Sequence, residues 1–124
     1  MTSARDLLLG GVSEEQLAQH VKVLARRGGW CGYHVRYSEA VVEGVHTMRL
    51  NGHSDAHGMP DWVFVNERPG LPLLLIELKS EKGRVSADQG RWADLLERTN
   101  GVLSAIWRPS DESEIRSTML GPGH

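Results

Sequence analysis

Three charged residues occur where the surrounding sequence is most apolar. Glu77 and Lys79 follow the apolar run at residues 73–76, and Asp61 lies sixteen positions before Glu77. A charged side chain in such surroundings is costly unless it is paired or bound to a metal ion. Because side chains alternate along a strand, Glu77 and Lys79 point to one face and Leu78 points to the other. This pattern predicts a functional site at the end of the run.

The two acids favour a metal site made of oxygen ligands. Asp61 opens the strand that precedes the strand of Glu77, so a hairpin would place the two carboxylates side by side. Neighbouring carboxylates repel, and one of them stays protonated unless a cation lies between them. Oxygen ligands favour Mg²⁺ or Mn²⁺ over zinc. The ammonium of Lys79 would then orient an attacking water or offset charge on a phosphate.

The elements that must position these residues follow from local signals. Ser13 to Gln16 and Ser86 to Gln89 are capping boxes, each opening a helix. The pattern predicts helices at 14–27 and 86–99, strands at 30–35, 61–65, 73–79 and 102–107, and a short last helix at 110–120. In the second helix Trp92, Leu95 and Leu96 are expected to face inward. We expect a single α/β domain over 1–124, with helices flanking a central mixed sheet.

Residues 38–57 are rich in glycine, histidine and polar groups, and we expect a long loop or a hairpin there. The segment offers a second metal hypothesis. His53, Asp55 and His57 lie within five residues, and His34 and His46 could complete a zinc site. The alternative interpretation of His34 and His57 is polar lining near the carboxylates.

Composition limits the classes of function. The chain has 124 residues, a formal net charge of −2 and one cysteine, Cys31. This balance excludes a generally basic nucleic-acid binder, but Lys82, Arg84 and Arg91 form a local basic group for phosphate contacts. The apolar runs are too short for a membrane span or a signal peptide. We expect a cytoplasmic protein, which suits a single free cysteine.

Further motifs surround the charged residues in a fixed order. They are Gly58-Met59-Pro60-Asp61, Glu77-Leu78-Lys79, Gly83-Arg84-Val85-Ser86, Gln89, Trp92 and Trp107-Arg108-Pro109. Together they resemble the VRR-NUC branch of the PD-(D/E)xK nucleases, whose small members occur in bacteriophages and resemble Holliday-junction resolvases. The similarity covers roughly residues 14 to 111. The chain departs from the pattern in residues 38–57, Met59 and Trp62, which bears on substrate preference more than on chemistry.

The resemblance implies a role for each motif residue. Asp61, Glu77 and the carbonyl of Leu78 would bind Mg²⁺ or Mn²⁺. Lys79 would be the catalytic lysine, and Gln89 on the following helix a supporting polar group.

The resemblance also implies an acid on the first helix. Both Glu14 and Glu15 are candidates for catalysis and metal binding. We choose Glu14 because it shares a helical stripe with Leu17 and Val21.

The function expected on this basis is metal-dependent hydrolysis of DNA. A structure-specific endonuclease would cut branched or Holliday-junction DNA in recombination or repair and leave a 5′-phosphate, in the host cytoplasm if the chain is phage-encoded. Cutting two symmetry-related strands favours a homodimer, with Ile115, Met119 and Leu120 of the last helix as a contact.

Each motif residue also has a plainer explanation. Asp61 could be a turn residue, Glu77 and Lys79 an ion pair, and Gln89 only the third residue of a helix cap. A nuclease-fold module that binds branched DNA without cutting it, or that serves in assembly, is the alternative function. A zinc hydrolase that uses the histidine segment is a third.

Overall fold

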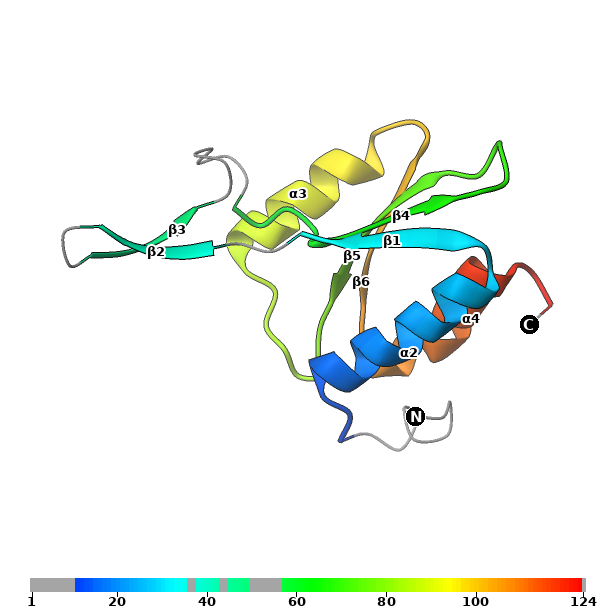
Figure 1. The fold of residues 1–124 in the computed structure, drawn as a ribbon, viewed down its shortest axis with the longest axis horizontal. Helices are drawn as coiled ribbons and strands as arrows, with labels where there is room; N and C mark the ends of the chain where they lie inside the picture. Colours follow the sequence, from blue (N-terminus) through cyan, green and yellow to red (C-terminus); the bar gives the residue numbers. More distant parts are fainter. Residues whose placement is uncertain (1–10, 36–37, 43–44, 50–56, 124) are drawn as a thin grey trace.

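The computed structural model describes residues 11–35, 38–42, 45–49 and 57–123. Its centre is a four-stranded mixed sheet with the strand order β1-β4-β5-β6 (Figure 1). The strands are β1 Trp30–His34, β4 Trp62–Asn66, β5 Leu73–Leu78 and β6 Val102–Trp107. The β1–β4 and β4–β5 pairs are antiparallel, whereas β5 and β6 are parallel and connected through a helix. This confirms the α/β fold with a mixed central sheet.

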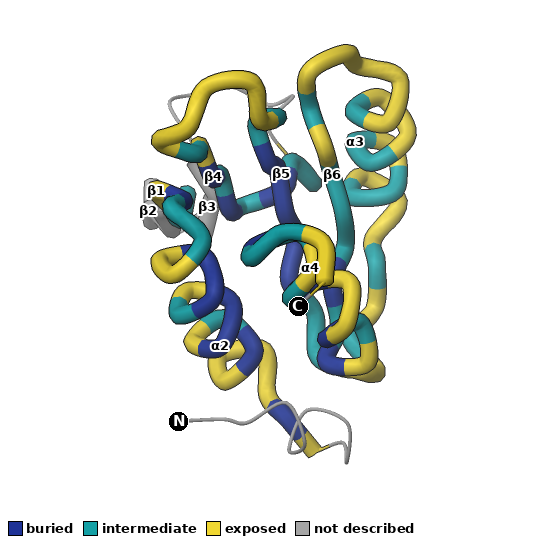
Figure 2. Tube along the Cα trace, turned by 90° about the vertical axis from the view of Figure 1, so that its right-hand side faces the viewer, coloured by how far each residue is buried: buried dark blue, intermediate teal, exposed yellow. Residues whose placement is uncertain are grey.

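The helices cover the two faces of this sheet unequally. Helices α2 (Glu14–Arg27) and α4 (Glu112–Leu120) lie together on one side, and α3 (Ala87–Glu97) lies on the other (Figures 1 and 2). The buried apolar cluster forms between α2, α4 and the sheet, and it includes Leu17, Phe64, Ile76 and Trp107. The apolar core is therefore one-sided.

Helix α3 packs mainly against β6 at the edge of the sheet and has no buried residue. Leu95 is 39% exposed, so the expectation that it faces inward is wrong. Trp92 and Leu96 are half-buried. The apolar stripe of α3 was correctly predicted from the sequence. Because α3 packs at the edge of the sheet, part of this stripe remains exposed to solvent.

Both predicted capping boxes are confirmed. The Ser13 hydroxyl accepts a hydrogen bond from the Gln16 amide at 3.1 Å, and the Gln16 side chain accepts one from the Ser13 amide at 2.9 Å. Ser86 and Gln89 make the same reciprocal pair at 3.1 and 3.0 Å. These contacts satisfy backbone donors that a helix start leaves without intrahelical partners, and they fix where α2 and α3 begin.

The apolar side of the last helix packs into the core of the chain. Ile115 and Met119 are 0% and 1% exposed and pack in the main cluster, with Leu120 partly buried against it. The prediction of an intermolecular contact is therefore wrong for Ile115 and Met119, and for Leu120 it stays a prediction. Their apolar face is used within the chain because α4 packs on α2.

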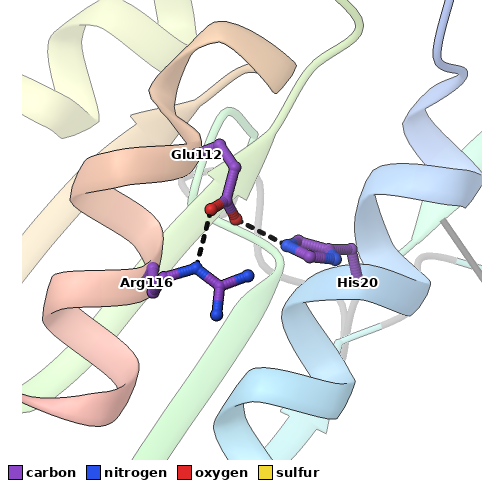
Figure 3. Close-up of polar contacts among 3 residues, drawn as sticks. All are labelled: His20, Glu112 and Arg116. Atoms are coloured by element: carbon purple, nitrogen blue, oxygen red, sulfur yellow. Dashed lines mark hydrogen bonds and ion pairs between the residues drawn. The ribbon is translucent and has the colours of Figure 1, made fainter. Parts of the chain in front are cut away.

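A buried polar network joins α2 to α4 (Figure 3). His20 and Glu112 are bonded through Nε2 and Oε2 at 2.6 Å, with both side chains 6% exposed. Nε of Arg116 donates to the other oxygen of Glu112 at 2.8 Å. One carboxylate thus bridges two helices, a contact that no local sequence signal indicated.

The segment after β1 contains a separate hairpin. Strands β2 (Ser38–Val42) and β3 (Val45–Arg49) pair antiparallel with each other and form a two-stranded sheet of their own. This agrees with the expected hairpin. No helix in the described part of the chain is long and apolar enough to cross a membrane.

Candidate active site

Asp61 and Glu77 meet at one end of the sheet. Trp62 pairs with Ile76 across β4 and β5, and the next position outward brings Asp61 opposite Glu77. The backbone N–H of Asp61 donates a hydrogen bond to the Glu77 carboxylate. The antiparallel hairpin therefore places the two acids side by side, as the sequence suggested.

The pKa of Glu77 is raised from 4.5 to about 7. Burial of the side chain is the largest cause, and the negative charge of Asp61 is the second. The charge of Lys79 and the Asp61 amide act in the opposite direction, while Glu14 adds to the rise. The residue is only 7% exposed. Glu77 therefore holds a proton near neutral pH unless a positive charge joins the two acids.

The two carboxylate oxygens of Asp61 differ in their hydrogen bonding. Its Oδ2 lies 3.2 Å from Nε2 of His34. Its Oδ1 is buried and has no hydrogen-bond partner in the part of the chain that the structure describes. Buried polar atoms are nearly always satisfied, so an orphaned carboxylate oxygen beside a second acid fits a position for a cation.

The carbonyl of Leu78 is a third oxygen at the same edge. Lys79 directs its N–H to Trp107 of β6, so Leu78, one residue before it, directs its carbonyl toward β4. Continuing the β4–β5 register brings Pro60 opposite Leu78. Proline has no N–H, so it cannot donate the ladder bond to this carbonyl. The proline before Asp61 thus leaves a backbone oxygen available next to both acids.

The charge of Glu14 on the first helix affects the Glu77 carboxyl less than the charge of Asp61 does. Glu14, and not Glu15, is among the charges that raise the pKa of Glu77, although both line a cleft with Asp61. Among the described residues, no three His, Cys, Asp or Glu side chains stand close enough to hold a metal ion. Two carboxylates and a carbonyl still suit Mg²⁺, which keeps several water ligands.

The loop after Lys79 is held by residues of a motif noted in the sequence. The guanidinium of Arg108 donates to the carbonyls of Ser80 at 2.7 Å and Glu81 at 2.9 Å. The side chain of Glu81 accepts two hydrogen bonds from Ser110, which lower its pKa. The chain that leaves β5 is therefore tied to the end of β6. The sequence marked Arg108 as part of a motif but gave no hint of this role.

The start of α3 closes the site from the other face. Gly58 has a φ of +85°, and a Cβ there would lie 2.3 Å from the Asp88 carbonyl carbon. Only glycine allows this approach, which places the residues before Asp61 against α3. Gln89 lines the adjoining clefts together with Glu77. Its Oε1 caps the helix, so its capping role and a position beside the site coexist.

Comparison with known proteins decides the family. The profile of the VRR-NUC domain matches residues 39–108, more than half of the chain. The chain belongs to the VRR-NUC family. Neither the curated proteins nor the solved structures gave a match.

Membership assigns nuclease activity and DNA binding to the VRR-NUC domain. The matched region contains Asp61, Glu77, Lys79 and Gln89, and it begins inside the hairpin. Residues 38–57, where the chain departs from the motif pattern, therefore fall almost wholly within the domain. Helix α2, which carries Glu14, precedes the match. The roles of Glu14 and of the matched site residues stay predictions.

The three basic residues predicted to bind phosphate do not line these clefts. Lys82 and Arg84 are exposed on the loop that Arg108 holds, and Arg91 is exposed on α3. Their role in phosphate contacts stays a prediction.

The structure describes two of the histidines considered for a metal site, His34 and His57. His57 lines a cleft with Asp61 and Glu77, and His34 bonds to Asp61. His53, Asp55 and the side chain of His46 lie outside what the structure describes, so the zinc hypothesis is untested there. The bond from His34 was missed, although a histidine in the strand beside Asp61 was the available signal.

Proposed function

We propose that this VRR-NUC domain is a divalent-metal-dependent endonuclease that hydrolyses phosphodiester bonds in DNA. The observation that carries the proposal is the orphaned Oδ1 of Asp61 beside Glu77, whose pKa is raised to about 7. Both features suit a pair of acids that binds a cation, because the contacts of the described residues leave Oδ1 of Asp61 without a partner.

Asp61, Glu77 and the Leu78 carbonyl would hold Mg²⁺ or Mn²⁺, with Glu14 acting from the first helix. Such an ion lowers the pKa of a bound water and polarises a phosphate oxygen. Glu77 must lose its proton for this role, and the positive charge of Lys79 favours that loss.

Lys79 and Gln89 would act on the reacting groups. The ammonium of Lys79 orients the attacking water and offsets negative charge that builds on the phosphate. The water oxygen bonds to phosphorus as the 3′-oxygen leaves in line, so the products carry a 3′-hydroxyl and a 5′-phosphate. The amide of Gln89 supports the water or the phosphate from the α3 side.

The preferred substrate would be branched DNA, including Holliday junctions. The motif resemblance supports this choice, and Lys82, Arg84 and Arg91 would hold the backbone through phosphate contacts. Resolving a junction requires two cuts related by symmetry, which a homodimer with two sites would supply.

Cleavage of labelled Holliday-junction, flap, linear duplex and single-stranded DNA with Mg²⁺, Mn²⁺ or chelator tests the proposal. We expect metal-dependent cutting that favours branched DNA and is absent in Asp61→Asn and Glu77→Gln. Binding without cutting under every metal condition would instead identify a DNA-binding module, and restoration by Zn²⁺ alone would support the histidine site.

A further inference from the structure

The cleft on the α2 side includes the proposed metal ligands Glu14, Asp61 and Leu78 but extends well beyond them. It has a volume of about 970 Å³ and lies between α2 and the β1 side of the sheet. The rest of its lining includes Gln19 and Lys22 on the helix, with His34 on β1 and Trp62 on β4. Its volume is at the upper end of the range of about 300–1,000 Å³ that is typical of ligand sites. A nucleotide-sized group could therefore enter it directly beside the site.

Three parallel rings lead from the core to this cleft. Phe64 stacks on Trp62, with centroids 5.8 Å apart, and Trp62 stacks on His34 at 4.3 Å. Both pairs are within 6° of parallel. Phe64 is 1% exposed and Trp62 is 9% exposed, whereas the His34 side chain is 35% exposed. Trp62 and His34 both line the cleft, and His34 is the outermost and most exposed ring of the stack.

The backbone of β1 is shaped to admit this stack. A Cβ at Gly32 would lie 2.6 Å from the Phe64 ring, so glycine leaves the space that the ring fills. His34 lies directly opposite Trp62 in the β1–β4 register. The strand pairing therefore sets the ring of His34 onto that of Trp62.

The imidazole of His34 is held from two directions. Trp62 supports one ring face, and the Nε2···Oδ2 contact to Asp61 at 3.2 Å fixes rotation in the ring plane. A flat side chain held in this way loses little entropy when another ring stacks on it. On the opposite wall, Lys22 offers a positive charge to a phosphate. Gln19 beside it offers an amide to the edge of a base.

We propose that this cleft receives an unpaired nucleobase next to the scissile phosphate, stacked on the exposed side of His34. The inference rests on the proposed nuclease function and specifies its substrate class. The required DNA has a nucleotide that can leave the stack at the cleavage point, as at a branch or flap. Intact duplex would have to unpair a base to enter, which costs a few kcal/mol.

The test measures binding and not cleavage. Fluorescence anisotropy would follow branched DNA in chelator and again with Ca²⁺, with one abasic nucleotide moved stepwise across the branch. We expect one abasic position to weaken wild-type binding about 5- to 100-fold, the loss expected for one base–aromatic stack. His34→Ala should show the same loss on intact DNA and no further loss at that position.

Two variants make the result specific. His34→Phe keeps a ring but not the bond to Asp61, and it should retain sensitivity to the abasic position. Tyr33→Ala removes a neighbouring ring that is 65% exposed, and it should behave as wild type.

If His34→Ala keeps the wild-type sensitivity, or if no abasic position matters, the stacking proposal is overturned while metal-dependent cleavage stands. Absence of any DNA binding by the wild type would overturn both proposals.

Discussion

Lys79 and the two acids share one end of the sheet, but they make separable contributions. Asp61 and Glu77 are coupled through the hydrogen bond from the Asp61 amide and through their charges. Lys79 follows on the same side of the strand, with its backbone anchored to Trp107 at 2.9 Å. Its side chain can therefore be changed without disturbing the pairing that holds the acids.

Replacing Lys79 by alanine should reduce cleavage strongly and leave DNA binding nearly unchanged. Removing one preorganised charge that stabilises a transition state typically reduces the rate by about 100- to 1,000-fold. Single-turnover cleavage and anisotropy binding measure the two effects separately. Lys79→Arg retains the charge and should recover part of the rate. Near-normal turnover in the alanine variant would remove Lys79 from the mechanism.

Replacing Glu77 by glutamine should stabilise the metal-free protein above pH 7. The unfolded carboxyl ionises near pH 4.5 and the folded one near pH 7, so the folded state binds the proton more tightly between these values. The free energy of unfolding of the wild type therefore falls as pH rises from about 4.5 to about 7 and then levels off.

The full pKa shift corresponds to about 3 kcal/mol, which solvent screening reduces to about 1–2 kcal/mol. Melting temperatures in chelator between pH 4 and 9 would show the difference between wild type and Glu77→Gln. Parallel pH curves for the two proteins would contradict the burial argument.

At the scale of elements, Glu112 is the residue that couples α2 to α4. Its carboxylate bonds to His20 and Arg116 while it is 5% exposed (Figure 3). Removing one partner of a buried charged network leaves the others uncompensated. The contact ties α2, the helix that carries Glu14, to α4.

Glu112→Ala should therefore lower the free energy of unfolding by about 3 kcal/mol, within the range for a broken buried ion pair. Glu112→Gln keeps the shape and some hydrogen bonding and should lose less. Urea unfolding would measure both, with Glu97→Ala as the control because Glu97 is exposed on α3. Equal losses in the Glu112 and Glu97 variants would show that the network adds nothing.

The elements were predictable where their signals are local. Capping residues gave the start of both long helices, and the apolar runs placed β5 and β6 within one residue of their ends. The hairpin argument also brought Asp61 beside Glu77. The contacts of His20, His34 and Arg108 were not predictable, because each joins residues more than 25 positions apart. The prediction that Leu95 faces inward failed for a related reason. Helical periodicity does not tell how much of a helix face the sheet covers.

The whole molecule has a core on one side of the sheet and its candidate site at one end. The tightly buried cluster lies between the sheet, α2 and α4, whereas Asp61 and Glu77 lie between clefts on the α2 and α3 sides. Most of the buried cluster thus lies away from the candidate site, although Trp62 and Leu78 belong to both. Surface changes near the site should alter recognition more than folding.

The hairpin of β2 and β3 provides the test of this separation. Its strands pair with each other and with no other strand of the described chain, and Figure 1 shows them extending beyond the main sheet. Replacing residues 40–55 by a Gly-Ser turn should therefore leave the melting temperature within about 2 °C of wild type, since the core residues that the structure describes are all kept. It should change the ratio of branched to linear DNA cleavage more than the single-turnover rate on the best substrate.

Metal affinity distinguishes this result from the histidine hypothesis. His57 and Gly58 stay in the shortened chain, so the contacts of Asp61 and Glu77 with α3 are kept. Calorimetric titration with Mg²⁺ or Mn²⁺ should give the same affinity in both proteins, because every ligand proposed for the metal lies outside the deleted residues. Loss of metal binding in the shortened chain would show that His46, His53 or Asp55 supplies a ligand, and the zinc site would then replace the two-carboxylate site.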